Sequence, residues 1–333
     1  MNNAITSIAG VYVGHYTDRE KATGCTVILC PEGAVASVDV RGGSPGTRET
    51  DLLRPGYTVE EIHGILLTGG SAFGLEAAGG VMRYLAQNGH GYRTSVRPVP
   101  IVPAAVIFDL GVGDSLAYPT AEAAYQACLE AQDGPVTEGS VGAGTGATVG
   151  KATGVGYSTK GGLGSYSARL PNGRTVAALV VVNALGDVVD PGDGHVLAGT
   201  RQPQGGFADS SLLLKAGFVR GAPPPTANTI IGVVATDAPL SRGQAYRVAQ
   251  MAQDGIARVV RPSHTLFDGD TIFVIAAPGI GLNQRGRAAG VGPGDANAIG
   301  VAAAEVVALA IVRAVSLAEG LAGIPAARDL GTV

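Results

Sequence analysis

Residues 227–236 have the sequence ANTIIGVVAT, and the run of apolar and β-branched residues in it begins at Thr229. A second such run, 271–276, directly follows the acidic sequence DGD at 268–270. Strands that are apolar at nearly every position are typical of sheets covered on both faces. We therefore expect two buried strands, one that starts with a hydroxyl side chain and one that two carboxylates precede.

The rest of the chain alternates between predicted strands and helices. Further strands are expected where short β-branched runs are bounded by glycine or proline, at 25–29, 34–40, 65–68, 102–108 and 176–182. Helices are expected at 73–87, 120–132, 239–257 and 297–318. The last of these is apolar nearly all round but contains Glu305 and Arg313, which favours a buried helix over a membrane span. The pattern predicts a layered α+β or α/β protein.

Composition narrows the class of protein. The 333 residues are 46% hydrophobic and 15% charged, with a formal net charge of -4, which excludes intrinsic disorder and disfavours nucleic acid or an anionic membrane as a partner. The cysteines are Cys25, Cys30 and Cys128, in no disulfide or CxxC pattern. The first residues lack the pattern of a secretory signal. We therefore expect a soluble, cytoplasmic protein.

Motifs for metals and cofactors fail on inspection. The five histidines never approach the i,i+4 spacing of a helical zinc pair. The sequence GAGTGA at 142–147 fits a relaxed dinucleotide fingerprint, but no helical pattern follows it. The two carboxylates at 268–270 are too few for a dedicated calcium site, and a tight turn is the simpler interpretation of that triplet. We expect neither a metal nor a cofactor.

Several segments, in order along the chain, together resemble the S58, or P1, peptidase family. They are DVRGG at 39–43, GTRETD at 46–51, LTGGSAFGL at 67–75, GAGTGATVGK at 142–151, ANTIIGVVAT at 227–236 and DGDT at 268–271. That family includes L-aminopeptidase/D-esterases, β-peptidyl aminopeptidases and nylon-oligomer hydrolases. The resemblance implies an N-terminal-nucleophile hydrolase: one α+β domain over 1–333, folded as a four-layer αββα sandwich and self-cleaved into 1–228 and 229–333. It also implies a homo-oligomer, a tetramer of processed units.

Threonine at the nucleophile position with asparagine before it is most similar to the nylon-oligomer hydrolases. The resemblance places self-cleavage between Asn228 and Thr229 and makes Thr229 the nucleophile. A threonine hydroxyl is a poor nucleophile, but a free α-amino group on the same residue, with a pKa of about 8, can accept its proton near neutrality. Cleavage before Thr229 creates that base. The proline-rich segment 221–226 would hold the cleaved peptide exposed, although composition alone favours a simple linker.

The resemblance also supplies the neighbours of the nucleophile. Lys151 and Asn183 would lie beside it, and Asp268 and Asp270 would be the supporting carboxylates. Lys151 lies among glycine, alanine and threonine, which suggests partial burial, and Asn183 follows a strand, from which its amide can reach a developing oxyanion. Without the family pattern, a surface lysine and a turn asparagine would be the preferred interpretations. Phe108 is a departure, because related sequences can carry a tyrosine there.

Three classes of function remain open at this point. The leading one is a hydrolase that cleaves amide bonds of small peptides or ω-amino-acid oligomers such as those of 6-aminohexanoate, with stepwise aminopeptidase action on β-Ala, Gly or D-Ala N-termini as the alternative. The second is an acyl transferase similar to ornithine acetyltransferases, whose Met-Ala-Thr-Met surroundings are missing at Thr229. The third is a binding protein that keeps the fold and never processes itself.

Overall fold

A computed structural model describes residues 3–217, 228–276 and 290–333. The proline-rich segment 221–226, expected to be a linker or an exposed approach to the cleavage point, lies outside these residues. The helices are α1 (Ala78–Gln87), α2 (Ala121–Leu129), α3 (Ser210–Lys215), α4 (Arg242–Val259) and α5 (Pro293–Ser316). Short 3-10 turns occur at Ile5–Ser7, Asp51–Leu53, Ser71–Ala77, Gly142–Gly144, Val155–Tyr157 and Ala327–Leu330.

One mixed sheet of nine strands dominates the described residues, in the order β3-β5-β4-β2-β14-β12-β9-β8 with β1 paired to β2. Its strands are β1 (Tyr12–Asp18), β2 (Thr23–Val40), β3 (Thr47–Arg48), β4 (Glu61–Thr68), β5 (Ala104–Val106), β8 (Gly162–Arg169), β9 (Thr175–Asn183), β12 (Thr229–Thr236) and β14 (Thr271–Ala276). Two small sheets add β6 (Thr148–Val149) with β7 (Thr159–Lys160), and β10 (Asp187–Val189), β11 (Val196–Ala198) and β13 (Val260–Arg261).

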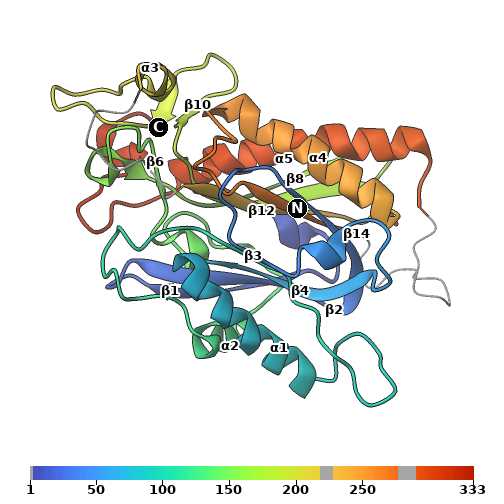
Figure 1. Cartoon of the computed structure of the whole chain (residues 1–333). Helices are drawn as coiled ribbons and strands as arrows, with labels where there is room; N and C mark the ends of the chain where they lie inside the picture. Colours follow the sequence, from blue (N-terminus) through green and yellow to red (C-terminus); the bar gives the residue numbers. More distant parts are fainter. Residues whose placement is uncertain (1–2, 218–227, 277–289) are drawn as a thin grey trace.

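This sheet forms two layers, and the long strand β2 runs from one layer into the other (Figure 1). Its first part pairs with β1 and β4, and its last part, 35–40, pairs with β14. The pairing with β4 shifts its register between Leu29 and Ala34. The sequence predicted two strands here, at 25–29 and 34–40, and this was wrong because a single strand passes through both. Apolar side chains from the two layers, among them Ile65, Leu67, Ile231 and Phe273, pack together between them.

Helices cover both outer faces. α1 and α2 pack on the layer that contains β4, where Val81 and Leu85 belong to one cluster with Val27 and Leu66. α4 and α5 pack on the layer that contains β9, β12 and β14, where Ile311 lies in one cluster with Val180 and Val234. The protein is therefore an αββα sandwich (Figure 1), and the predicted α+β fold is confirmed.

Capping residues set where the helices begin. Ser241 forms a capping box with Gln244, so α4 begins at Arg242 and not at residue 239 as predicted. Thr120 accepts a hydrogen bond from the Ala123 N–H group and caps α2. α5 is long and apolar enough to span a membrane, yet 67% of its most apolar stretch is buried within the protein. The predicted buried helix is thus confirmed.

The sequence failed to predict β8, because glycine and serine in GLGSYSAR favour turns. The structure supplies the reason for the glycines. A Cβ on Gly164 would lie 2.1 Å from the carbonyl oxygen of Ala310, and one on Gly162 would lie 2.5 Å from that of Ala314. Both carbonyls belong to α5. The glycines allow this helix to lie directly on the sheet.

Strand directions bring the predicted site together. β12 lies between β9, to which it is antiparallel, and β14, to which it is parallel. The start of β12 therefore meets the end of β9 and the start of β14 at one end of the sheet. Thr229 is the register partner of Asn183.

Candidate active site

Thr229 is the first residue of β12 and is buried, with 5% of its surface exposed. The residue before it, Asn228, forms a parallel bridge with Asp268 in the loop that leads to β14. Asn183 stands opposite Thr229 on β9. Local strand pairing thus gathers residues that lie far apart in sequence around the Asn228–Thr229 peptide bond.

The carbonyl group of Asn228 receives two hydrogen bonds. The Thr229 Oγ1 hydroxyl donates to its oxygen, and the N–H group of Gly269 donates to the same oxygen at 3.0 Å. Gly269 leaves no room for a side chain, since a Cβ there would lie 2.9 Å from Thr229 Oγ1 and 2.8 Å from the carbonyl oxygen of Ser44. The hydroxyl lies against the carbonyl group that it would attack, and a backbone donor already polarises that group.

Lys151 is buried and donates hydrogen bonds to both oxygens of Asn183. Its Nζ atom lies 2.9 Å from the Asn183 backbone oxygen and 2.8 Å from Oδ1. Burial lowers the pKa of Lys151 to about 7, against the opposing attraction of the Asp268 carboxylate. The ammonium group is therefore poised to lose its proton near neutral pH, next to the register partner of Thr229.

Two further contacts fix the orientation of the Asn183 amide group. Its Oδ1 atom also accepts a hydrogen bond from the Thr148 N–H group at 3.0 Å, and its Nδ2 atom donates to the Phe108 carbonyl oxygen at 3.2 Å. The oxygen thus faces Lys151. The sequence placed Asn183 in the site, but gave no sign that the backbone of residue 108 would be its partner.

Asp270 ties the start of β12 to the loop before β14. Its Oδ1 atom accepts a hydrogen bond from the Ile230 N–H group at 2.8 Å. Its Oδ2 atom accepts one from the His264 N–H group at 3.0 Å and lies 2.7 Å from His264 Nδ1. The carboxylate therefore holds the residue next to Thr229 in place. The sequence missed His264, and its only signal was a position six residues before Asp270.

Asp268 is buried beside it and is held by its own loop. Its Oδ2 atom accepts hydrogen bonds from the Thr265 N–H group at 2.9 Å and the Thr265 hydroxyl at 2.5 Å, and its Oδ1 atom accepts one from the Leu185 N–H group at 3.4 Å. Burial, and then repulsion from Asp270, raise the pKa of Asp268 to about 6. Asp268 is thus a second group at the site that titrates near neutrality.

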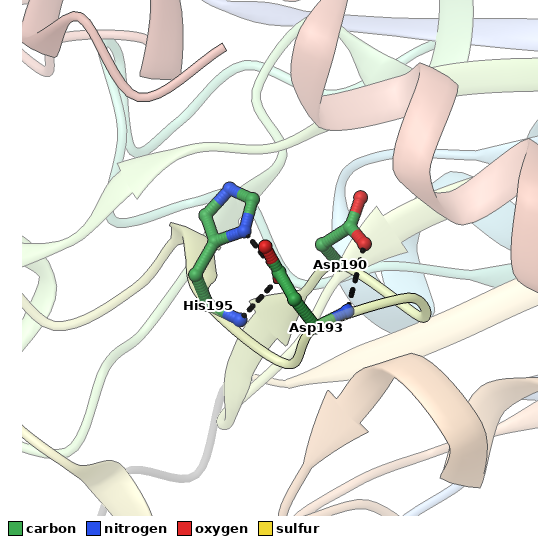
Figure 2. Close-up of side chains that lie close together, drawn as sticks. All are labelled: Asp190, Asp193 and His195. Atoms are coloured by element: carbon green, nitrogen blue, oxygen red, sulfur yellow. Dashed lines mark hydrogen bonds and ion pairs between the residues drawn. The ribbon is translucent and has the colours of Figure 1, made fainter.

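A separate cluster that the sequence did not suggest lies on the surface, in the turn between β10 and β11. Asp190, Asp193 and His195 present ligand atoms that lie within 4.8 Å of one another (Figure 2). Hydrogen bonds already join these groups, since His195 Nδ1 lies 2.6 Å from Asp193 Oδ1 and the Asp193 N–H group donates to Asp190 Oδ1 at 3.4 Å. Hydrogen bonds of this kind are typical of a solvent-exposed turn.

Comparison with known proteins agrees with this architecture. The model of peptidase family S58 matches residues 3–328. An uncharacterized aminopeptidase of Mycobacterium leprae is 45% identical over 97% of this chain and 92% of its own length. A 6-aminohexanoate-oligomer endohydrolase of Kocuria sp. is 33% identical over 92% of this chain and 84% of its own length.

Solved structures share the fold. A β-aminopeptidase of Burkholderia sp. superposes with a TM-score of 0.69 at 26% identity, over 99% of this chain and 92% of that one. An L-aminopeptidase D-Ala-esterase/amidase of Ochrobactrum anthropi, described as a variant of the Ntn hydrolase fold, superposes with a TM-score of 0.74 at 24% identity, over 97% and 88%. Fold and relatives together define a hydrolase of peptide or amide bonds. This chain belongs to peptidase family S58.

Proposed function

We propose that this chain is a self-processing hydrolase that cleaves itself between Asn228 and Thr229 and then uses Thr229 to cleave amide bonds of small peptides or ω-amino-acid oligomers. One observation carries the proposal. The Thr229 hydroxyl lies against the Asn228 carbonyl group, which a backbone N–H group of Gly269 already holds. Nucleophile, electrophile and oxyanion donor therefore meet at one peptide bond.

In the first reaction, the Thr229 oxygen attacks the Asn228 carbonyl carbon. The C–N bond breaks, the nitrogen takes up a proton, and Asn228 is left as an ester on the hydroxyl oxygen. Water then hydrolyses the ester and frees both the hydroxyl and the α-amino group of Thr229. Because that amine does not yet exist in the first step, another base must accept the hydroxyl proton. Lys151 and Asp268, with pKa values of about 7 and about 6, are suited to this role.

In turnover, the new α-amino group of Thr229 accepts the hydroxyl proton, since its ordinary pKa of about 8 lies near neutrality. The hydroxyl attacks the substrate carbonyl, the leaving amine takes the proton, and water hydrolyses the acyl-enzyme. Asn183 assists with the second N–H of its amide nitrogen, since the first donates to the Phe108 carbonyl oxygen, and Lys151 in its protonated form disfavours protonation of the nearby amine. Asp270 keeps the strand start in register.

Stepwise aminopeptidase action is the second candidate. The relative from Mycobacterium leprae is named an aminopeptidase at 45% identity, above the 33% of the oligomer endohydrolase, and the Burkholderia structure is of a β-aminopeptidase. Incubation with a 6-aminohexanoate oligomer, and with β-alanyl and glycyl p-nitroanilides, separates the two activities. Ornithine added as an acceptor would reveal an acyl transferase by the N-acyl product.

The matched control in each assay is Thr229→Ala. Hydrolysis of any of these substrates is expected to require the Thr229 hydroxyl, so the variant should hydrolyse none of them. Full activity in the variant would refute the proposed nucleophile.

We also propose that the processed units form a homo-oligomer in the cytoplasm and act on a small substrate, not on nucleic acid or membrane. A monomer in light scattering at working concentration would refute the assembly.

A further inference from the structure

Lys160 and Asp109 are among the ionisable side chains outside the proposed catalytic set that are buried as deeply as those within it. Lys160, at the end of β7, has no exposed surface, and Asp109, which follows β5, has 2%. A buried charge is costly unless the protein compensates it with hydrogen bonds or an opposite charge. Residues of this kind outside a catalytic set need a reason for their position.

Lys160 holds the backbone segment that leads to the site. Its Nζ atom donates to the carbonyl oxygens of Thr145 and Ala147, both at 2.7 Å. Lys160 is also the register partner of Thr148, whose N–H group holds Asn183 Oδ1. The ammonium group thus fixes the peptide from which the Asn183 oxygen is held.

Asp109 lies next to the backbone that holds the nitrogen of the Asn183 amide group. Its Oδ1 atom accepts a hydrogen bond from the Gly70 N–H group at 2.6 Å, and its Oδ2 atom accepts one from the Thr23 hydroxyl at 2.8 Å. The residue before it, Phe108, supplies the carbonyl oxygen that accepts from Asn183 Nδ2. The Asn183 oxygen is therefore held by Thr148, the register partner of Lys160. The Asn183 nitrogen is held by the carbonyl group of Phe108, the residue before Asp109.

Gly146 lies next to the contacts of both charged residues. This glycine lies between the two residues whose carbonyl oxygens bind Lys160, and a Cβ on it would lie 2.8 Å from Asp109 Oδ2. Burial lowers the pKa of Lys160 to about 7. The Asp109 carboxylate opposes this shift, because its negative charge stabilises the protonated ammonium group.

We propose that Asp109 and Lys160 are positioning residues, a buried pair that orients the Asn183 amide and sets the electric field at Lys151. This inference rests on the proposed roles of Lys151 and Asn183. The charged groups that act on Lys151 are Asp268 and Asp109, which raise its pKa, and Lys160, which lowers it. Asp109 and Lys160 therefore act on Lys151 with opposite sign.

The opposite signs give a test that a merely structural role would not pass. Lysine labelled with carbon-13 at Cε allows each ammonium group to be titrated by NMR in the full chain, which has only four lysines, and Lys151→Arg assigns the signal of Lys151. Lys160→Met should move the titration midpoint of Lys151 to higher pH, and Asp109→Asn should move it to lower pH. Each shift should be on the order of one pH unit, as for charges that interact through a protein interior.

The double variant, Asp109→Asn with Lys160→Met, should return the midpoint close to that of the wild type. The exposed residues Lys215 and Asp193 supply the controls, since Lys215→Met and Asp193→Asn should leave the midpoint unchanged. A midpoint that stays in place in both single variants, or moves in the same direction in both, would overturn the tuning role.

A single variant that leaves one charge buried without its partner can fail to fold, and the double variant then carries the test of the positioning role through its kcat. It should fold with an unchanged Lys151 midpoint and a kcat lowered by about tenfold or more at unchanged KM, because the Asn183 amide is less well held. A wild-type kcat in the folded double variant would overturn the positioning role. The NMR titration does not depend on catalysis, so its failure is distinct from that of the proposed function, which activity in Thr229→Ala would show.

Discussion

Replacing Asp270 by asparagine tests how the start of β12 is held for catalysis. The carboxylate accepts hydrogen bonds from the N–H groups of Ile230 and His264 and contacts the His264 ring. An asparagine can keep an oxygen on only one side. The orientation that costs least keeps it on His264, where two contacts lie, and turns the amide toward the Ile230 N–H group, which then has no acceptor.

The magnitude follows from that single lost contact. A hydrogen bond to a charged acceptor contributes about 1.5–3 kcal/mol, which corresponds to self-cleavage that is slower by roughly 10- to 150-fold if the loss is felt in the transition state. The rest of the core is untouched, so the thermal midpoint should fall by no more than a few degrees.

The assay is a pulse of cell-free synthesis followed by a chase, with the fraction of intact chain measured on gels over time. Asp193→Asn is the matched control, because it removes an exposed carboxylate that also accepts hydrogen bonds from a histidine. Circular dichroism and thermal unfolding check that each variant folds. Folded Asp270→Asn that cleaves itself as fast as the wild type would show that this carboxylate does not position Thr229.

Three further predictions follow from the same contacts. Gly269→Ala should block self-cleavage on gels, because its Cβ would press on Thr229 Oγ1 and the Ser44 oxygen, and processing at the normal rate would show that the close approach of Gly269 to Thr229 is not needed for self-cleavage. Asn183→Ala should lower kcat by roughly 100-fold, as for the loss of one oxyanion donor, and an unchanged kcat would exclude that role. Burial lowers the pKa of Lys151 from 10.5 to about 7, so the cost of burying its charge is fully present below pH 7 and disappears toward pH 10.5. In the Thr229→Ala background, where both proteins remain a single chain, the unfolding free energy relative to the variant that also carries Lys151→Met should therefore rise over that window in denaturant titrations, and a flat difference would contradict the buried ammonium.

Strands that are apolar throughout were the easiest elements to predict from the sequence. β12 and β14 have the bounds expected from their apolar runs. β8 was missed because its glycines respond to close packing by α5, which local sequence does not encode. Separate strands were predicted at 25–29 and 34–40 because glycine and proline lie between the two runs, although the single strand β2 passes through both.

The site was predicted through a family pattern and not from physical signals alone. Without that pattern, Lys151 would have been placed on the surface, as most lysines are, and the structure buries it. Asp109 and Lys160 were not predicted to be buried, because their burial depends on tertiary contacts between distant segments. Gly269 was missed because its contribution is a backbone N–H group, which every residue except proline has.

Intact-mass measurement of the purified wild type and of Thr229→Ala tests self-cleavage most directly. We predict that the wild type consists of two chains, 1–228 and 229–333, the second with a free Thr229 amine that N-terminal sequencing identifies. Thr229→Ala should remain one chain and hydrolyse no amide substrate. An active wild type that stays a single chain, or a Thr229→Ala variant that separates into the same two chains, would contradict the proposed role of Thr229.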